Sequence, residues 1–223
     1  MSLNKKKLII YGNGHIAETV FYSFKDNKDY DFVGFCVEKK FITSKTLCNL
    51  PIIEFEEIEI KFKQDDVFFI TAIGYQNMNS LRDDIYKKIK EKRYKFINLI
   101  SKNSIINETC ELGENNIIFE GNNIQAKTVI GNNNILWSGN HIGHHTIIQN
   151  NCFISSHVVV SGSCKINNNV FIGVNATLID NILVGEKAFI GPGTLVLKNI
   201  ESYSVLTCKN SILSKATSNK LKL

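Results

Sequence analysis

An unbroken repeat of six residues fills the second half of the 223-residue chain and limits its possible folds more than any other feature. Every sixth residue is aliphatic at seventeen consecutive positions: Ile100, Ile106, Leu112, Ile118, Ile124, Ile130, Leu136, Ile142, Ile148, Ile154, Val160, Ile166, Ile172, Leu178, Val184, Ile190 and Val196. Neither an α-helix, with a period of 3.6, nor a simple strand, with a period of 2, produces this pattern. A hexapeptide β-helix does, and we expect one over residues 100–200.

Three hexads make one triangular coil of 18 residues, in which each aliphatic side chain points into a prism. The turns need residues that tolerate a left-handed backbone, so asparagine and glycine should follow the aliphatic position. The segments "IGNNNI" at 130, "INNNVF" at 166 and "IGPGTL" at 190 meet this need. We therefore expect a rigid prism in one register, with residues 18 apart stacked at about 4.8 Å, the spacing of neighbouring strands.

The first 99 residues have a different pattern, in which short apolar runs alternate with helical periods. We expect strands at residues 7–12, 30–37, 66–74 and 95–100, and helices at residues 15–26 and 78–94. Such alternation is typical of a parallel sheet of Rossmann type. The chain is thus divided into an α/β Rossmann-like domain (1–99), an all-β parallel β-helix (100–200) and a C-terminal tail (201–223).

A glycine turn, "YGNGHI", lies where the first expected strand gives way to the first helix. Gly12 and Gly14 let the backbone turn sharply, and the helix N-terminus offers free N–H groups to an anion. The motif lacks the third glycine of the G-x-G-x-x-G dinucleotide fingerprint. It predicts an anion-binding turn without specifying the ligand.

Four of the five histidines lie in "HIGHHTIIQNNCFISSHVVVSG", residues 141–162. With an 18-residue coil, His144 is expected directly beneath Gly162, whose backbone N–H has no side chain of its own in front of it. This pair suits acyl transfer, because an imidazole can take a proton from an attacking amine or hydroxyl while a backbone N–H holds the developing oxyanion. The alternative is that His144 is a solvated turn residue. His145 is either an orienting partner or an exposed turn residue.

The chain resembles the bacterial sugar acyltransferases that join a Rossmann-like domain to a left-handed β-helix, namely the PglD-like nucleotide-aminosugar N-acetyltransferases and the NeuD-like sialic-acid O-acetyltransferases. The resemblance rests on "IIYGNGHIAETV", "DFVGFCVE" and "FFITAIGYQNMNSLR" in the first half. In the second half it rests on the histidine segment, "FIGVNATLIDNILVGEKAFIGPGTLVLKNI" and the hexads. It implies a left-handed prism, a homotrimer, acetyl-CoA as acyl donor in the groove between adjacent prisms, and a nucleotide-linked sugar as acceptor.

The resemblance also implies roles for single residues. His144 matches the catalytic base and Gly162 the glycine whose amide faces the thioester carbonyl, while His145 stands where the family usually has an acidic residue. Acceptor contacts are expected from Gly12, Asn13, Gly14, His15, Glu38 and Gly74. Donor contacts are expected from Gly162, Gly191 and Gly193.

Other residues of the prism favour structural roles. Trp137 is expected at the trimer contact or the domain junction, and Cys152 and Cys164 in the core. His141 is expected to be structural, and His157 either supports the subunit groove or has no role.

Composition and charge narrow the function classes. With 43% apolar and 21% charged residues, the chain resembles an ordinary soluble protein, and it has no apolar run long enough to span a bilayer. The net charge of +5 comes from lysine clusters without interleaved aromatic residues, which favours a solvated surface over a nucleic-acid site. The scattered cysteines and a first apolar run that ends in a glycine turn, rather than a signal peptide, favour the cytoplasm.

The sequence thus predicts acetyl-CoA-dependent N-acetylation of a nucleotide-linked amino-deoxysugar for a surface glycan, without a metal. O-acetylation of a sugar hydroxyl is the alternative, since the same base and amide would serve. A γ-type carbonic anhydrase shares the prism, but no histidine lies 18 residues from His141 or His145, and the first domain would have no explanation. A non-catalytic trimer that binds nucleotide-sugars is the remaining alternative.

Overall fold

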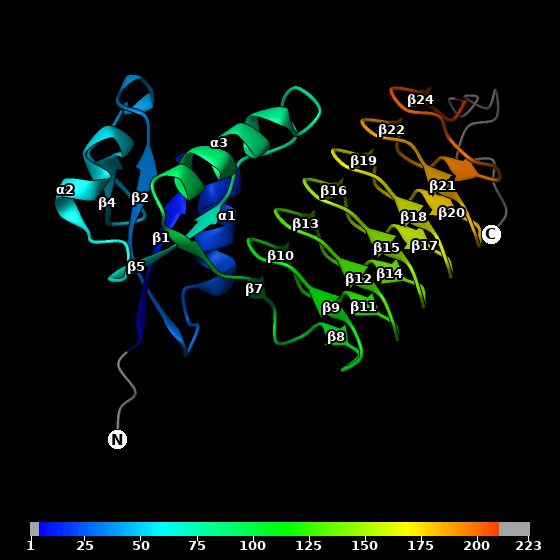
Figure 1. Cartoon of the computed structure of the whole chain (residues 1–223), viewed down its shortest axis with the longest axis horizontal. Helices are drawn as coiled ribbons and strands as arrows, with labels where there is room; N and C mark the ends of the chain where they lie inside the picture. Colours follow the sequence, from blue (N-terminus) through cyan, green and yellow to red (C-terminus); the bar gives the residue numbers. More distant parts are fainter. Residues whose placement is uncertain (1–4, 210–223) are drawn as a thin grey trace, which may run out of the picture.

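The computed structural model describes residues 5–209 as two units in contact (Figure 1). An α/β unit comes first, and a long three-sided prism of stacked coils follows it. The predicted fold class, a Rossmann-like domain followed by a left-handed parallel β-helix, is confirmed. No helix between residues 5 and 209 has both the length and the apolar character needed to cross a membrane.

The N-terminal unit has one six-stranded sheet of order β3-β4-β2-β1-β5-β6. Its strands are β1 (Lys6–Tyr11), β2 (Tyr30–Val37), β3 (Thr46–Leu47), β4 (Leu50–Glu54), β5 (Val67–Thr71) and β6 (Lys95–Phe96). Its helices are α1 (His15–Phe24), α2 (Ile58–Lys61) and α3 (Ser80–Glu91), with 3-10 turns η1 (Lys39–Phe41) and η2 (Phe55–Glu57). All neighbours pair in parallel except β3 and β4, an antiparallel hairpin that the apolar pattern did not reveal.

The central strand β1 is apolar along most of its length because both faces of the sheet are covered. Leu8 and Ile10 pack with Val20 of α1 on one face, whereas Ile9 packs with Ile89 of α3 on the other. The three β1 side chains are completely buried. A continuous apolar run at this point in the sequence therefore marks a strand buried from two sides.

The prism consists of two-residue strands in three parallel sheets, which we call faces 1, 2 and 3. Face 1 contains β7 (Leu99–Ile100), β10 (Ile117–Ile118), β13 (Ile135–Leu136), β16 (Phe153–Ile154), β19 (Phe171–Ile172), β22 (Phe189–Ile190) and β24 (Val205–Leu206). Face 2 contains β8 (Ile105–Ile106), β11 (Asn123–Ile124), β14 (His141–Ile142), β17 (Val159–Val160), β20 (Thr177–Leu178) and β23 (Leu195–Val196). Face 3 contains β9 (Glu111–Leu112), β12 (Val129–Ile130), β15 (Ile147–Ile148), β18 (Lys165–Ile166) and β21 (Leu183–Val184).

Each prism strand pairs with the strand one coil further on, so residues 18 apart lie side by side. Ile118, Leu136 and Ile154 form one such row on face 1. From position 118 to position 196 every residue of the hexad series is 0 or 1% exposed. The first three members are only partly buried, because they lie in the first coil. The expected 18-residue register is confirmed.

The turns of the prism have a left-handed backbone three residues after the inward aliphatic residue. This conformation occurs at Gly121 (φ 72°), Asn133 (φ 59°), His145 (φ 57°) and His157 (φ 58°). Asparagine, glycine and histidine are enriched in this region of backbone space, which is why these turns carry so many of them.

Two boundaries differ from the expected ones. The segment "KFINLI" forms two strands, β6 in the first sheet and β7 on face 1, because the chain crosses there from one unit to the other. Past residue 200, β24 pairs with β22, so the prism extends into the segment expected as a tail. The rest of that expected tail, from residue 210 onward, lies outside the described residues.

Face 1 shares a core with the N-terminal unit. Phe119 packs against Phe24 of α1, with ring centroids 5.8 Å apart, and stacks on Trp137 at 4.6 Å. Tyr75, in the loop before α3, contacts Phe153 at 5.0 Å. Trp137 therefore lies at the domain junction, one of the two places expected for it.

Candidate active site

His144 lies in the turn between β14 on face 2 and β15 on face 3. We call the stacked turns between these two faces the His144 corner. Ala126, His144, Gly162 and Asp180 occupy the same position in four successive coils, since each is 18 residues from the next. The side chains of His144 and His145 are both exposed.

The imidazole of His144 lies against Gly162, as the register predicts. A Cβ atom added to Gly162 would be 2.6 Å from Cε1 and 2.8 Å from Nε2 of the ring. Real Cβ atoms do not approach other heavy atoms so closely, so any side chain at position 162 would displace the imidazole. Glycine is needed here for this close approach rather than for an unusual backbone angle.

His145 holds the other side of the His144 ring. The Nδ1 atoms of His144 and His145 are 3.2 Å apart, and the two rings meet edge to face. Among residues 5–209, no protein group forms a hydrogen bond with Nε2 of His144. The contact supports His145 as an orienting partner and leaves Nε2 available to a substrate.

The amide of Gly162 is not unobstructed, and this part of the sequence-based interpretation is wrong. Its N–H donates a hydrogen bond of 2.8 Å to Oδ1 of Asp180. Sequence reasoning missed Asp180, although one more step of 18 residues beyond Gly162 leads to it. The oxyanion donor proposed from the sequence is therefore engaged by a carboxylate in this structure.

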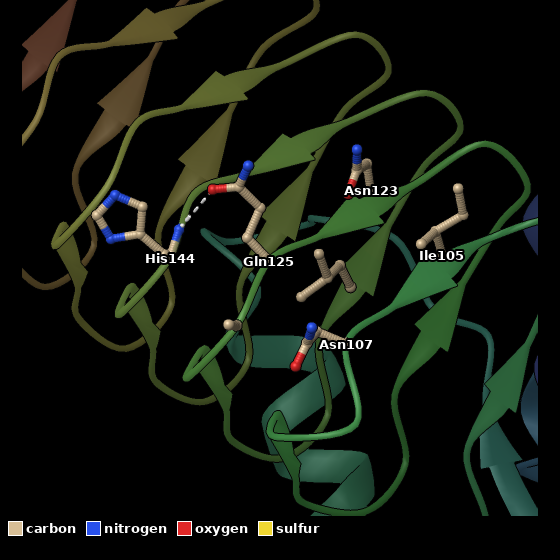
Figure 2. Close-up of a pocket in the computed structure, with 7 residues that line it drawn as sticks. Ile105, Asn107, Asn123, Gln125 and His144 are labelled. Atoms are coloured by element: carbon tan, nitrogen blue, oxygen red, sulfur yellow. Dashed lines mark hydrogen bonds between the residues drawn. The ribbon is translucent and has the colours of Figure 1, made fainter.

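A cavity of about 340 Å³ lies on face 2 beside His144 (Figure 2). The backbone N–H of His144 donates to Oε1 of Gln125 at 3.0 Å, which leaves the amide NH₂ of Gln125 free of this bond. The lining is amide and aliphatic, with no charged side chain: Ile105, Asn107, Asn123, Ile124, Gln125, Ala126 and His144. Such a surface suits a neutral ligand with hydroxyl groups.

A second cavity, of about 650 Å³, lies in the N-terminal unit where β1, β2 and β5 end. Four residues expected at the acceptor site line it: Asn13, Gly14, His15 and Gly74. Gly14 is the N-cap of α1, so the free N–H groups of that helix face this end of the sheet.

Gly12 and Glu38, also expected at the acceptor site, do not line this cavity. Gly12 has a φ of 132° and passes so close to Ala72 that a Cβ would be 2.8 Å from the Ala72 carbonyl oxygen. The Glu38 carboxylate pairs with Lys88 at 2.6 Å and Lys40 at 2.9 Å. These hydrogen bonds, that of Lys88 first, lower the pKa of Glu38.

The expected donor contacts divide between two corners of the prism. Gly191 and Gly193 lie in the turn between β22 on face 1 and β23 on face 2, whereas Gly162 lies at the His144 corner. One chain therefore does not bring these glycines to the same corner.

The remaining candidates have structural surroundings. The His157 ring lies against Gly139, where a Cβ would be 2.8 Å from Nδ1. Cys152 and Cys164 belong to the prism core, and His141 is a half-buried residue of β14. Within residues 5–209, no three His, Cys, Asp or Glu side chains are grouped so that they could hold a metal ion.

Fold and site together have the architecture of a hexapeptide-repeat transferase with a Rossmann-like N-terminal unit. Residues 127–162 match the family described as bacterial transferase hexapeptide (six repeats). A comparison with curated proteins finds no match.

Several solved structures share the whole fold. A mutant of perosamine N-acetyltransferase from Caulobacter crescentus, in complex with CoA and GDP-perosamine, has a TM-score of 0.82 at 20% identity, covering 92% of this chain and 95% of that one. The acetyltransferase domain of PglB from Neisseria gonorrhoeae has a TM-score of 0.80 at 19% identity, covering 88% and 93%. WeeI from Acinetobacter baumannii has a TM-score of 0.79 at 16% identity, covering 90% and 96%. The resemblance to these transferases is confirmed for the fold.

Proposed function

We propose that this protein is an acetyl-CoA-dependent acyltransferase that acetylates the amino group of a nucleotide-linked amino-deoxysugar. The observation that carries the proposal is the apposition of His144 and Gly162, with Nε2 of His144 unbonded beside an amide-lined cavity. The complex of perosamine N-acetyltransferase with CoA and GDP-perosamine, a protein of the same fold, supports both substrate classes.

The proposed reaction is direct. The acceptor nitrogen forms a bond with the thioester carbonyl carbon, and Nε2 of His144 takes the proton from that nitrogen. The Gly162 N–H holds the resulting oxyanion, for which Asp180 must release its hydrogen bond. The C–S bond then breaks, and the CoA sulfur leaves with the electron pair and takes up a proton.

The acceptor site is proposed in the cavity of the N-terminal unit. The diphosphate of a nucleotide-sugar would meet the N-terminus of α1 at Gly14 and His15, where free N–H groups and the helix dipole favour an anion. Asn13 and Gly74 would contact the rest of the ligand, while Gly12 shapes the turn. Glu38 would reach the ligand only by giving up its lysine partners.

A homotrimer is proposed because one chain separates the two halves of the site. The N-terminal unit packs on face 1, His144 lies between faces 2 and 3, and the two cavities share no lining residue. Acceptor bound to one copy would reach His144 of another. Gly191 and Gly193 of the adjacent prism would then lie along the donor groove.

O-acetylation of a sugar hydroxyl is the second candidate. The cavity beside His144 has no carboxylate in its lining to hold an ammonium group, so a neutral hydroxyl acceptor fits its charge as well. The six cysteines are free thiols, which fits a reducing compartment, and we place the reaction in the cytoplasm. A nucleotide-linked product is activated for glycosyl transfer, which fits a role in surface glycan synthesis.

A panel assay tests the function. Purified protein is mixed with acetyl-CoA and nucleotide-linked sugars that carry either an amino or only hydroxyl groups, and thiol release and product mass are followed. We expect one added acetyl group on an amino sugar. Acetylation confined to hydroxyl sugars would move the assignment to O-acetylation, and binding without turnover on either set would contradict both.

A further inference from the structure

The two histidines of the turn are arranged for more than orientation. Two ring nitrogens 3.2 Å apart form a hydrogen bond only if one carries a proton and the other offers a lone pair. If Nε2 of His144 is to accept a proton from a substrate, the proton of the neutral ring must be on Nδ1. His144 Nδ1–H then donates to Nδ1 of His145, whose own proton is on Nε2.

We propose that His145 receives the proton from Nδ1 of His144 during the reaction, so that the pair acts as a proton relay. The inference rests on the proposed function. It assigns to a second imidazole the stabilising task that a carboxylate performs for many catalytic histidines. His145 acts through His144 and is therefore a positioning residue that also carries charge.

The relay balances protons and charge. As the acceptor nitrogen bonds to the carbonyl carbon, its proton moves to Nε2 of His144, and the Nδ1 proton of His144 moves to Nδ1 of His145. His144 stays neutral, and the positive charge lies on the His145 ring, which is exposed to water. When the C–S bond breaks, the sulfur takes the Nε2 proton of His144, and the proton on His145 returns to His144 Nδ1.

The backbone fixes the relay geometry. His145 has a φ of 57°, and its N–H donates to the Ala126 carbonyl at 3.0 Å. Lys127, Ser163 and Asn181 hold the same left-handed position in the coils on either side, with φ of 58°, 57° and 62°. The His145 side chain is thus presented by a turn that the neighbouring coils repeat.

His145→Asn separates a relay from simple orientation. Asparagine tolerates the left-handed backbone, and its amide oxygen can accept the His144 Nδ1–H, but it cannot take up a proton. We expect kcat to fall about tenfold or more, with the KM of both substrates within about twofold of the wild type. Lys127→Asn, the same change at the same turn position one coil away, should leave kcat unchanged.

The kinetic readout is a proton inventory of the acyl-transfer step in mixtures of H₂O and D₂O. Two protons in transit predict a curved plot for the wild type and a straight one for His145→Asn. A His145→Asn variant with wild-type kcat, or with the same curvature, would overturn the relay while leaving the proposed function intact.

A second measurement needs no turnover. Nitrogen-15 NMR of the labelled imidazoles should show neutral His144 protonated at Nδ1 and neutral His145 protonated at Nε2. His144 protonated at Nε2 in its neutral form would overturn the relay, whatever the panel assay finds. Absence of turnover in that assay with the expected tautomers would instead count against the proposed function.

Discussion

The proposed chemistry depends on single atoms at the His144 corner. Extending the 18-residue register from His144 finds Gly162, and one further step finds Asp180, so the sequence contained the whole column. It could not show that Asp180 bonds the Gly162 amide or that Lys88 bonds Glu38. Those bonds depend on side-chain conformations and, for Lys88, on packing between elements 50 residues apart.

Gly162→Ala should abolish most of the activity without unfolding the protein. The new Cβ would be 2.6 Å from Cε1 of His144 and would push the ring out of place. Because misplacement of a catalytic group by about 1 Å can cost about 100-fold, we expect a loss of that order in kcat. Circular dichroism and thermal unfolding should remain close to wild type, and full activity in the variant would contradict the proposed geometry.

Asp180→Ala should raise the activity. Without the carboxylate, the Gly162 amide is free to bind the thioester oxygen, and no like charge opposes the oxyanion. We expect kcat/KM for acetyl-CoA to rise about threefold or more, measured by initial rates of thiol release. A large loss of activity would mean that Asp180 assists the reaction rather than competing with the substrate.

At the scale of elements, the hexad repeat carried the prediction of the prism. A period of six with three strands per coil fixes which residues point inward and which stack, so register and core follow from spacing alone. The N-terminal unit was less predictable. The hairpin of β3 and β4 has strands too short for periodicity, and "KFINLI" divides between two sheets because of how the units pack.

Position along the prism should determine the cost of truncating a hexad residue. Ile148 is completely buried, whereas Ile106 in the first coil is only partly buried. Ile148→Ala should lower the free energy of unfolding by about 2–5 kcal/mol, and Ile106→Ala by clearly less. Denaturant titrations at one protein concentration compare the two, and equal losses would contradict the open first coil.

At the scale of the whole molecule, a buried arginine joins the two units. Arg82 of α3 is completely buried and donates to the carbonyls of Gly74 at 2.9 Å, Asn133 at 3.1 Å and Asn151 at 2.7 Å. Burial lowers the pKa of its guanidinium to about 10, so the group stays charged near neutral pH. It ties a residue of the acceptor cavity directly to a corner of the prism.

Arg82→Lys should weaken acceptor binding more than donor binding. A lysine keeps the charge but cannot bond all these carbonyls at once, so the Gly74 segment loses part of its support. We expect the KM of the nucleotide-sugar to rise about fivefold or more, with the KM of acetyl-CoA nearly unchanged. Equal changes in both constants would indicate a general loss of structure instead.

The central claim is that His144 is the base of an acyl transfer, and its most direct test is the rate of thiol release from acetyl-CoA by His144→Gln. Glutamine keeps a polar side chain at the corner but cannot accept the proton. With an acceptor that the wild type acetylates, we predict a fall in kcat of about 100-fold or more while both substrates still bind. Turnover by His144→Gln at the wild-type rate would contradict the account.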